Sequence, residues 1–242
     1  MNLLLLSNST VFGMRPLEHA LHALKAFLGD ERIICFVPYA LVNHDGYTAQ
    51  MQEVLAPLGV TVRGIHMFSS PRQAVEGARV LFVGGGNSFR LLKALQQHEL
   101  LDTVRRRVRA GDLRYIGASA GTNMACPSLR TTNDMPIVQP HSFEAFGLLP
   151  FQINPHYFDP DATSTHMGET RARRIEEFLE ENDVPVLGMR EGSWLQRRGS
   201  ELRLEGIADA RFFARNAEQE DIAPGTDLSW LLELPAQFDH PA

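Results

Sequence analysis

Cysteine is scarce in this chain, which contains only Cys35 and Cys126. One possible pair is no disulfide framework of the kind that holds small secreted domains together, so the sequence indicates a reducing, cytoplasmic setting. Long hydrophobic runs are lacking as well. The first apolar stretch, Leu3–Leu6, is too short for the core of a signal peptide, and no other run approaches the length of a membrane span. We therefore expect a soluble protein without a membrane partner.

Positive charge is also in short supply. The 23 lysines and arginines are outnumbered by 29 aspartates and glutamates, which gives a formal net charge of −6. Without a dominant basic face, nucleic acid is not an expected partner. The nine histidines and two cysteines show none of the spacings of a zinc site, such as H-E-x-x-H or C-x-x-C. We expect no metal and no other cofactor.

What the chain does have is a regular alternation of two kinds of segment in its first half. Short apolar runs alternate with segments whose apolar residues recur at helical spacing. The predicted strands are Leu3–Leu6, Ile33–Val37, Val60–Ile65, Arg79–Val83 and Leu113–Ile116, and the predicted helices are Pro16–Leu28, Tyr47–Leu58, Pro71–Gly77 and Ser88–Gln97. This pattern is typical of an α/β protein with a mostly parallel sheet and helices on both faces. Ligands of such sheets bind at the carboxyl ends of the strands.

The second half of the chain is organised more loosely. We expect strands at Phe151–Asn154 and Pro185–Met189, a helix at Glu169–Asn182, and a hairpin formed by Ser193–Arg197 and Glu201–Leu204. The tail from Ala217 is acidic and contains proline, so we expect it to be loosely held. No repeat or linker interrupts the chain, which predicts a single domain over residues 1–242.

The segment from Gly117 to Gly121 reads Gly-Ala-Ser-Ala-Gly and joins an apolar run to a helix-compatible one. This is the order of a nucleophile elbow, in which two glycines allow a strained turn that exposes the serine, here Ser119. The backbone amide of Ala120 then points to where an oxyanion would form. A short motif of this kind is equally compatible with a simple tight turn.

Two further residues follow predicted strands in the same way. His156 comes just after the strand at Phe151–Asn154, and Glu191 just after the strand at Pro185–Met189. With Ser119 they form a chemically complete set of nucleophile, base and supporting carboxylate. Taken singly, such a histidine is compatible with a hydrogen-bonding role and such a glutamate with a solvated turn. The order serine, histidine, glutamate differs from that of ordinary α/β-hydrolases.

Three consecutive glycines, Gly84–Gly86, follow the fourth predicted strand. They belong to neither a G-x-G-x-x-G motif nor a phosphate-binding loop with Gly-Lys-Ser/Thr. We favour a loop that turns backbone N–H groups toward the elbow and completes an oxyanion hole, with Gly86 or Asn87 as donor. The alternative is a tight turn that binds nothing.

Longer runs of sequence surround these residues. They are Val83–Asn87, Ile116–Gly121, Cys126–Pro136, Gln152–His156, Gly168–Arg171 and Gly188–Trp194. Together they resemble peptidase E, the family of α-aspartyl dipeptidases, and the resemblance extends over nearly the whole chain. Its most specific parts are the Arg-Thr-Thr-Asn-Asp-Met-Pro run that begins at Arg130 and the Ile-Asn-Pro-His run that ends at His156.

The resemblance implies a class I glutamine-amidotransferase-like fold with a serine at the elbow. It also implies a Ser119–His156–Glu191 triad and the cleavage of dipeptides whose N-terminal residue is aspartate. Cyanophycinases share the fold and the serine elbow, and a catalytically silent module that holds an anion at Gly84–Gly86 is an alternative of another class. The run around Thr132 favours peptidase E. The oligomeric state, monomer or homodimer, stays open.

Three residues are expected to contact the substrate. Arg171 lies near the centre of the apolar face of its predicted helix, where a cation in the first turn is poorly placed unless an anion meets it. We expect it to bind the aspartyl carboxylate, the alternative being an internal ion pair with Glu144 or Asp159. Asp134 is expected to bind the substrate amine or to shape the site, and it is the rival of Glu191 as triad acid. Thr132 is assigned to the substrate-binding group.

Overall fold

The larger of two β-sheets forms the centre of the protein. The computed structural model describes residues 1–160, 163, 165 and 168–239. Five neighbouring strands of the larger sheet are parallel, and two more extend it in the antiparallel sense. In spatial order the strands are β3 (Thr61–Gly64), β2 (Ile33–Val37), β4 (Val80–Val83), β5 (Arg114–Ala118), β1 (Asn2–Leu6), β8 (Ser193–Arg198) and β9 (Glu201–Gly206). The predicted α/β fold with a mostly parallel sheet is confirmed, and so is the hairpin.

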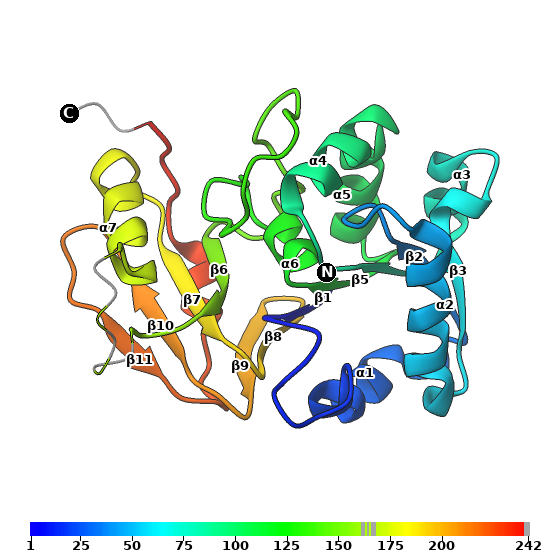
Figure 1. Cartoon of the computed structure of the whole chain (residues 1–242), viewed down its shortest axis with the longest axis horizontal. Helices are drawn as coiled ribbons and strands as arrows, with labels where there is room; N and C mark the ends of the chain where they lie inside the picture. Colours follow the sequence, from blue (N-terminus) through cyan, green and yellow to red (C-terminus); the bar gives the residue numbers. More distant parts are fainter. Residues whose placement is uncertain (161–162, 164, 166–167, 240–242) are drawn as a thin grey trace.

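Helices cover this sheet on both faces, as Figure 1 shows. Leu4 and Leu6 of β1 pack toward one layer, which contains α1 (Leu21–Leu28) and α2 (His44–Leu55). Leu3 and Leu5 pack toward the other layer, formed by α3 (Pro71–Gly77), α4 (Ser88–Gln97), α5 (Leu100–Ala110) and α6 (Ala120–Ala125). Because both faces are buried, β1 reads as an unbroken run of leucines instead of an alternating pattern.

A smaller four-stranded sheet lies beside the larger one, on the left of Figure 1. It is formed by the parallel pair β6 (Gln152–Tyr157) and β7 (Val186–Arg190), with β10 (Ala210–Phe213) and β11 (Glu220–Ile222) antiparallel at one edge. Helix α7 (Arg171–Glu181) connects β6 to β7 and packs Ile175 and Leu179 against the sheet. The chain then crosses from β7 to β8 through Glu191 and Gly192, which places the end of the small sheet beside the large one.

Two predicted helices differ from the structure at their ends. The helix expected from Pro16 begins at Leu21, because Leu17 has a positive φ of 59° and residues Glu18–Ala20 form a 3₁₀ turn. The helix expected over residues 47–58 starts earlier, because the Asn43 side chain accepts the N–H of Gly46 and caps it.

The segment after Ala217 is packed, where the sequence predicted a loose tail. It provides β11 and a 3₁₀ helix, Ser229–Glu233, and it buries Leu228 and Leu231 in the main core. Backbone hydrogen bonds in both directions between Asp183 and Gln237 hold its end. The prediction was wrong because it rested on the acidic composition of the tail, whereas Leu228 and Leu231 pack against apolar residues that are distant in the sequence.

Candidate active site

Ser119 occupies the single position between β5 and α6. Its φ of 52° and ψ of −110° mark a strained turn. The two flanking glycines make this turn possible. A Cβ on Gly117 would lie 2.5 Å from the carbonyl oxygen of Gly121, and a Cβ on Gly121 would overlap the carbonyl oxygen of Val83. The Gly-Ala-Ser-Ala-Gly motif therefore forms an elbow because the backbone passes too close to its neighbours for any side chain at those positions.

The imidazole of His156 lies within hydrogen-bond distance of both other residues proposed from the sequence as a triad. The Nε2 atom of His156 is 2.8 Å from the Oγ of Ser119, and its Nδ1 is 2.7 Å from the Oε1 of Glu191. An ionised carboxylate only accepts hydrogen bonds, so Nδ1–H donates to Glu191. Nε2 is then the acceptor for the serine hydroxyl. About half of the Glu191 side chain is exposed, and the imidazole lies partly open to solvent.

His156 reaches this position through a β-bulge. Pro155 pairs with Met189 and Tyr157 with Arg190, so His156 is the extra residue between two registered pairs. Its φ is 54°, which is unusual for a residue with a side chain. Bulges re-aim side chains in this way. The sequence predicted a strand that ended before His156, whereas the strand continues through it.

Two polar residues that follow β1 bond to the backbone beside His156 and beside Glu191. The buried Oγ of Ser7 accepts the backbone N–H of His156 at 3.0 Å and donates to the carbonyl oxygen of Met189 at 2.8 Å. The Oδ1 of Asn8 accepts the N–H of Gly192 at 2.9 Å. Sequence reasoning missed these roles. The available signal was a polar run directly after a buried strand, at the same sheet edge as the elbow.

The glycine loop lies against the elbow. A Cβ on Gly85 would be 3.2 Å from the Cβ of Ser119. Of the two loop donors expected for an oxyanion hole, Asn87 is already engaged, because its backbone N–H donates to the carbonyl oxygen of Ala40 at 3.1 Å. The N–H groups of Gly86 and Ala120 have no acceptor within the described part of the chain. These two are the donors that remain for a ligand.

Asp134 and Thr132 bond to the first turn of α4 and not to the imidazole. The Oδ2 of Asp134 accepts the backbone N–H of Ser88 at 2.7 Å, and the hydroxyls of Thr132 and Ser88 are 2.7 Å apart. Between them, the amide of Asn133 donates to the carbonyl oxygen of Pro155, next to the bulge. The run therefore ties α4 to the strand that carries His156. Glu191, and not its rival Asp134, contacts the imidazole.

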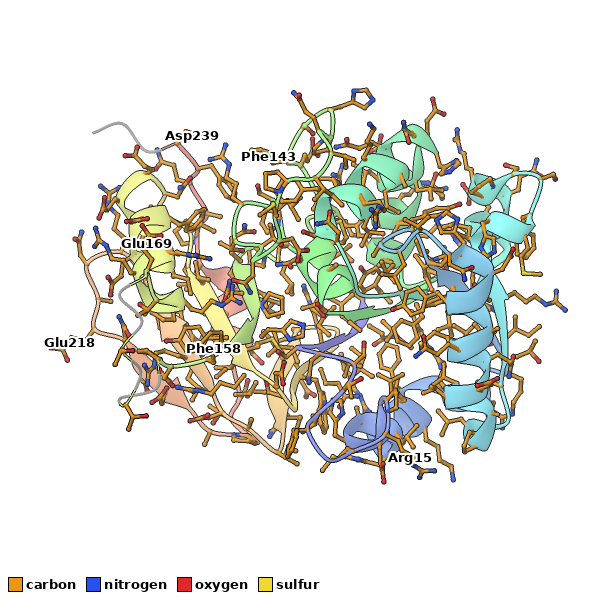
Figure 2. The ribbon with its side chains drawn as sticks, viewed as in Figure 1. Arg15, Phe143, Phe158, Glu169, Glu218 and Asp239 are labelled. Carbon is orange, nitrogen blue, oxygen red and sulfur yellow. The ribbon has the colours of Figure 1, made fainter. Side chains whose placement is uncertain are left out.

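Arg171 stands in the first turn of α7, and its guanidinium lies 5.2 Å from the centre of the Phe158 ring. Figure 2 shows Phe158 where the chain leaves β6. Burial lowers the pKa of Arg171, and the charge of Arg174 lowers it further, while the charge of Asp134 acts in the opposite direction. A cation in this position is poorly stabilised.

The ion pairs expected as alternatives for Arg171 do not form. Glu144 pairs with Arg105 at 2.6 Å, and Asp159 pairs with Arg190 and Arg211, each at 2.6 Å. Among the residues that the structure describes, no carboxylate oxygen lies within 4.0 Å of the Arg171 guanidinium. Within the described part of the chain, Arg171 therefore has no counter-ion.

The described residues also bear on the needs of metal and thiol chemistry. Within them, no group of three or more histidine, cysteine, aspartate or glutamate side chains is arranged to hold a metal ion. Cys35 and Cys126 are free and buried, and burial raises the pKa of each thiol to about 12.

No helix in the described part is long and apolar enough to cross a bilayer.

Comparison with known proteins gives consistent matches over the whole chain. The model of peptidase family S51 matches residues 3–205. The chain is 58% identical over 239 residues to a protein of Streptomyces coelicolor named peptidase E, which covers 99% of this chain and 98% of that protein. It is 47% identical over 234 residues to a probable alpha-aspartyl dipeptidase of Drosophila melanogaster, with 96% and 98% covered.

Two solved structures share the fold. A putative peptidase E from Listeria monocytogenes superposes with a TM-score of 0.64 at 22% identity, covering 86% of this chain and 98% of that one. A peptidase from an acI-B1 Actinobacterium gives a TM-score of 0.66 at 16% identity, covering 94% and 96%. Since the family model spans the elbow, the bulge and the β7–β8 crossover, the chain belongs to peptidase family S51.

Proposed function

We propose that this protein is a serine dipeptidase that hydrolyses peptides with an N-terminal aspartate, Asp-Xaa. The observation that carries the proposal is the unbroken hydrogen-bonded path from Ser119 through His156 to Glu191, at 2.8 and 2.7 Å. The names of the relatives in Streptomyces and Drosophila support both the peptidase class and the aspartyl specificity. The two free, buried cysteines support a reducing, cytoplasmic compartment.

The proposed chemistry is acyl transfer in two halves. The Oγ of Ser119 attacks the carbonyl carbon of the substrate aspartate while Nε2 of His156 takes the hydroxyl proton. Glu191 stabilises the resulting imidazolium through Nδ1–H. His156 then gives the proton to the departing amine, which leaves an ester on Ser119. Water, activated by the same imidazole, hydrolyses that ester and restores the serine.

The negative charge that develops on the carbonyl oxygen needs donors that are not already bonded. The N–H groups of Gly86 and Ala120 meet this condition in the described structure. Gly86 follows Gly85, which lies against Ser119, and Ala120 begins α6 directly after Ser119. Preorganised donors of this kind contribute about 3–4 kcal/mol each to transition-state stabilisation.

Recognition of the substrate is assigned to a pair of opposite charges. Arg171 has no carboxylate partner in the described residues, and the charge of Asp134 is close enough to influence its pKa. We propose that Arg171 binds the β-carboxylate of the substrate aspartate through its planar fork and that Asp134 receives the α-ammonium group. The hydrogen bond from the Ser88 N–H and that between Ser88 and Thr132 fix the orientation of the loop.

A dipeptide panel tests this function. Asp-Leu is expected to be cleaved, while Asn-Leu, which has nearly the same shape without the charge, is cleaved far more slowly. Replacement of Arg171 by methionine is expected to reduce the Asp-over-Asn preference at least tenfold by slowing Asp-Leu. Arg173→Met is the matched control, since that exposed side chain pairs along its own helix.

Other results of the dipeptide panel would assign a different function to the protein or a different role to Arg171. Cleavage of β-Asp-Arg in preference to Asp-Leu assigns a cyanophycinase-like activity, and no cleavage with tight aspartate binding assigns a silent module. An unchanged Asp-over-Asn preference in Arg171→Met moves the recognition role to another residue.

A further inference from the structure

Ser7 is a completely buried serine that lies outside the elbow and the proposed triad. It follows directly after β1, at the carboxyl edge where the two sheets meet. Its hydroxyl makes two hydrogen bonds, as acceptor from the N–H of His156 and as donor to the carbonyl oxygen of Met189. One small side chain of the large sheet thus bonds to both parallel strands of the small sheet.

The bond to His156 occurs at a strained residue. His156 is the extra residue of the β-bulge and has a φ of 54°, so its N–H has no partner in the ladder between β6 and β7. A residue held in such a conformation costs about 1–3 kcal/mol and persists only where its surroundings determine it. Ser7 supplies the acceptor that the bulge removes.

The bond to Met189 fixes the direction of this acceptor. A serine hydroxyl has one hydrogen, and in Ser7 it is directed to Met189, which leaves a lone pair for the N–H of His156. Met189 precedes Glu191 by two residues on the same strand end. The hydroxyl therefore couples the backbone position of the base to the strand that carries the acid.

We propose that Ser7 is a positioning residue for the proposed hydrolysis, one that holds His156 in line between Ser119 and Glu191. It touches neither substrate nor reacting atoms. Without its hydroxyl, the N–H of His156 loses its acceptor and the bulge relaxes, which moves Nε2 from the serine and Nδ1 from the carboxylate. This inference rests on the proposed function only in assigning the reaction that is slowed.

Replacement of Ser7 by alanine tests it. We expect kcat for Asp-Leu to fall about 10- to 100-fold with KM changed less than twofold, because misalignment by about 1 Å slows chemistry without altering binding contacts. The rate of Ser119 labelling by a fluorophosphonate, which needs the triad but no dipeptide, should fall by the same factor. Ser7→Thr keeps a hydroxyl and is expected to recover most of the lost rate.

Ser229→Ala is the matched control, because that hydroxyl also accepts a backbone N–H, from Leu202, and donates to an oxygen, of Asp227. It is expected to leave kcat and labelling unchanged. An equal loss in both variants, or a kcat in Ser7→Ala within twofold of wild type, overturns the proposal. Should Ser7→Ala fail to fold, Ser7→Cys replaces it, with a weaker donor of similar size and the same criteria.

A direct readout separates this inference from the proposed function. The proton on Nδ1 of His156, shared with Glu191, is expected to give a low-field NMR signal in the wild-type protein and to shift upfield or broaden in Ser7→Ala. If the wild type cleaves no Asp-Xaa peptide and resists the fluorophosphonate, the proposed function fails. In that case the NMR signal alone tests the role of Ser7, and the same signal in wild type and in Ser7→Ala overturns the inference.

Discussion

At the scale of single residues, the proposed chemistry depends on two backbone conformations that side chains usually avoid. Ser119 has a φ of 52° and His156 a φ of 54°. A backbone group of each residue is held by hydrogen bonds. The carbonyl oxygen of Ser119 accepts the N–H groups of Thr122 and Asn123, and the N–H of His156 donates to Ser7. In these conformations the two side chains meet, with Nε2 of His156 2.8 Å from Oγ of Ser119.

Ser119→Ala is expected to abolish turnover of Asp-Leu and leave the fold intact. Alanine fits the turn but provides no nucleophile, and members of a triad act as a unit, so a loss on the order of 10⁴-fold in kcat is expected. Steady-state kinetics and circular dichroism measure the two parts. Activity above a tenth of the wild-type value would contradict a serine mechanism.

Glu191 and Asp134 are expected to respond differently to amide substitution. Glu191→Gln removes the charge that supports the imidazolium, so kcat and fluorophosphonate labelling should both fall at least about 100-fold. Asp134→Asn can still accept the Ser88 N–H and should raise KM for Asp-Leu with labelling nearly unchanged. The reverse pattern would make Asp134 the acid.

At the scale of elements, the elbow depends on how closely α6 approaches β4. Gly121 is the second residue of α6 and lies against the carbonyl oxygen of Val83 at the end of β4. Tyr115 of β5 donates to the carbonyl oxygen of Gly121 at 2.6 Å, and the Thr122 hydroxyl donates to that of Leu6 at 2.6 Å. Helix and sheet are thus joined directly beside Ser119.

Gly121→Ala is expected to destabilise the protein by about 1–3 kcal/mol, because a Cβ there forces α6 away from β4. Ser119 moves with the helix, so labelling by a fluorophosphonate should also slow. Gly77→Ala is the control, since a Cβ on that residue of α3 meets nothing within 4 Å. Urea unfolding of both variants checks the difference, and equal stability would mean that the elbow tolerates the wider spacing.

At the scale of the whole molecule, the segment after β1 packs onto β8 through His19, which is buried against Trp194. His19 lies 6.3 Å from Trp194 between ring centroids, and neither ring nitrogen has a hydrogen-bond partner among the described residues. Burial lowers the pKa of His19 from its usual 6.5, and the charge of Glu191 offsets part of that shift. The folded state therefore disfavours the protonated ring.

The sign of the resulting pH dependence follows from this pKa. Well above pH 6.5, His19 is neutral in both states and does not affect stability. As the pH falls through 6.5, the unfolded chain binds a proton that the folded chain resists. The free energy of unfolding should fall as the pH drops from 7.5 to 5.5, and it should fall less in the His19→Leu variant. Urea midpoints at the two pH values measure this, with exposed His141→Gln as control. Equal pH slopes in wild type and His19→Leu would show that His19 is not the source.

The sequence by itself determined the features that depend on neighbouring residues. Runs such as Leu3–Leu6 favour burial and the glycines around Ser119 favour a crowded turn, so the strands and the candidate elbow were predictable. The position of Arg171 near the inner face of α7 also follows from helical periodicity.

Only the tertiary structure decided which distant residues meet. Ser7 and His156 are separated by 149 positions, and the bulge that aims His156 exists only when β6 pairs with β7. The bond that engages the N–H of Asn87 depends on the carbonyl group of Ala40, and the packing of the tail depends on partners for Leu228. A short stretch of sequence indicates which secondary structure it favours. It does not indicate which distant residue it will contact, because such a contact contributes free energy only when both partners are in place.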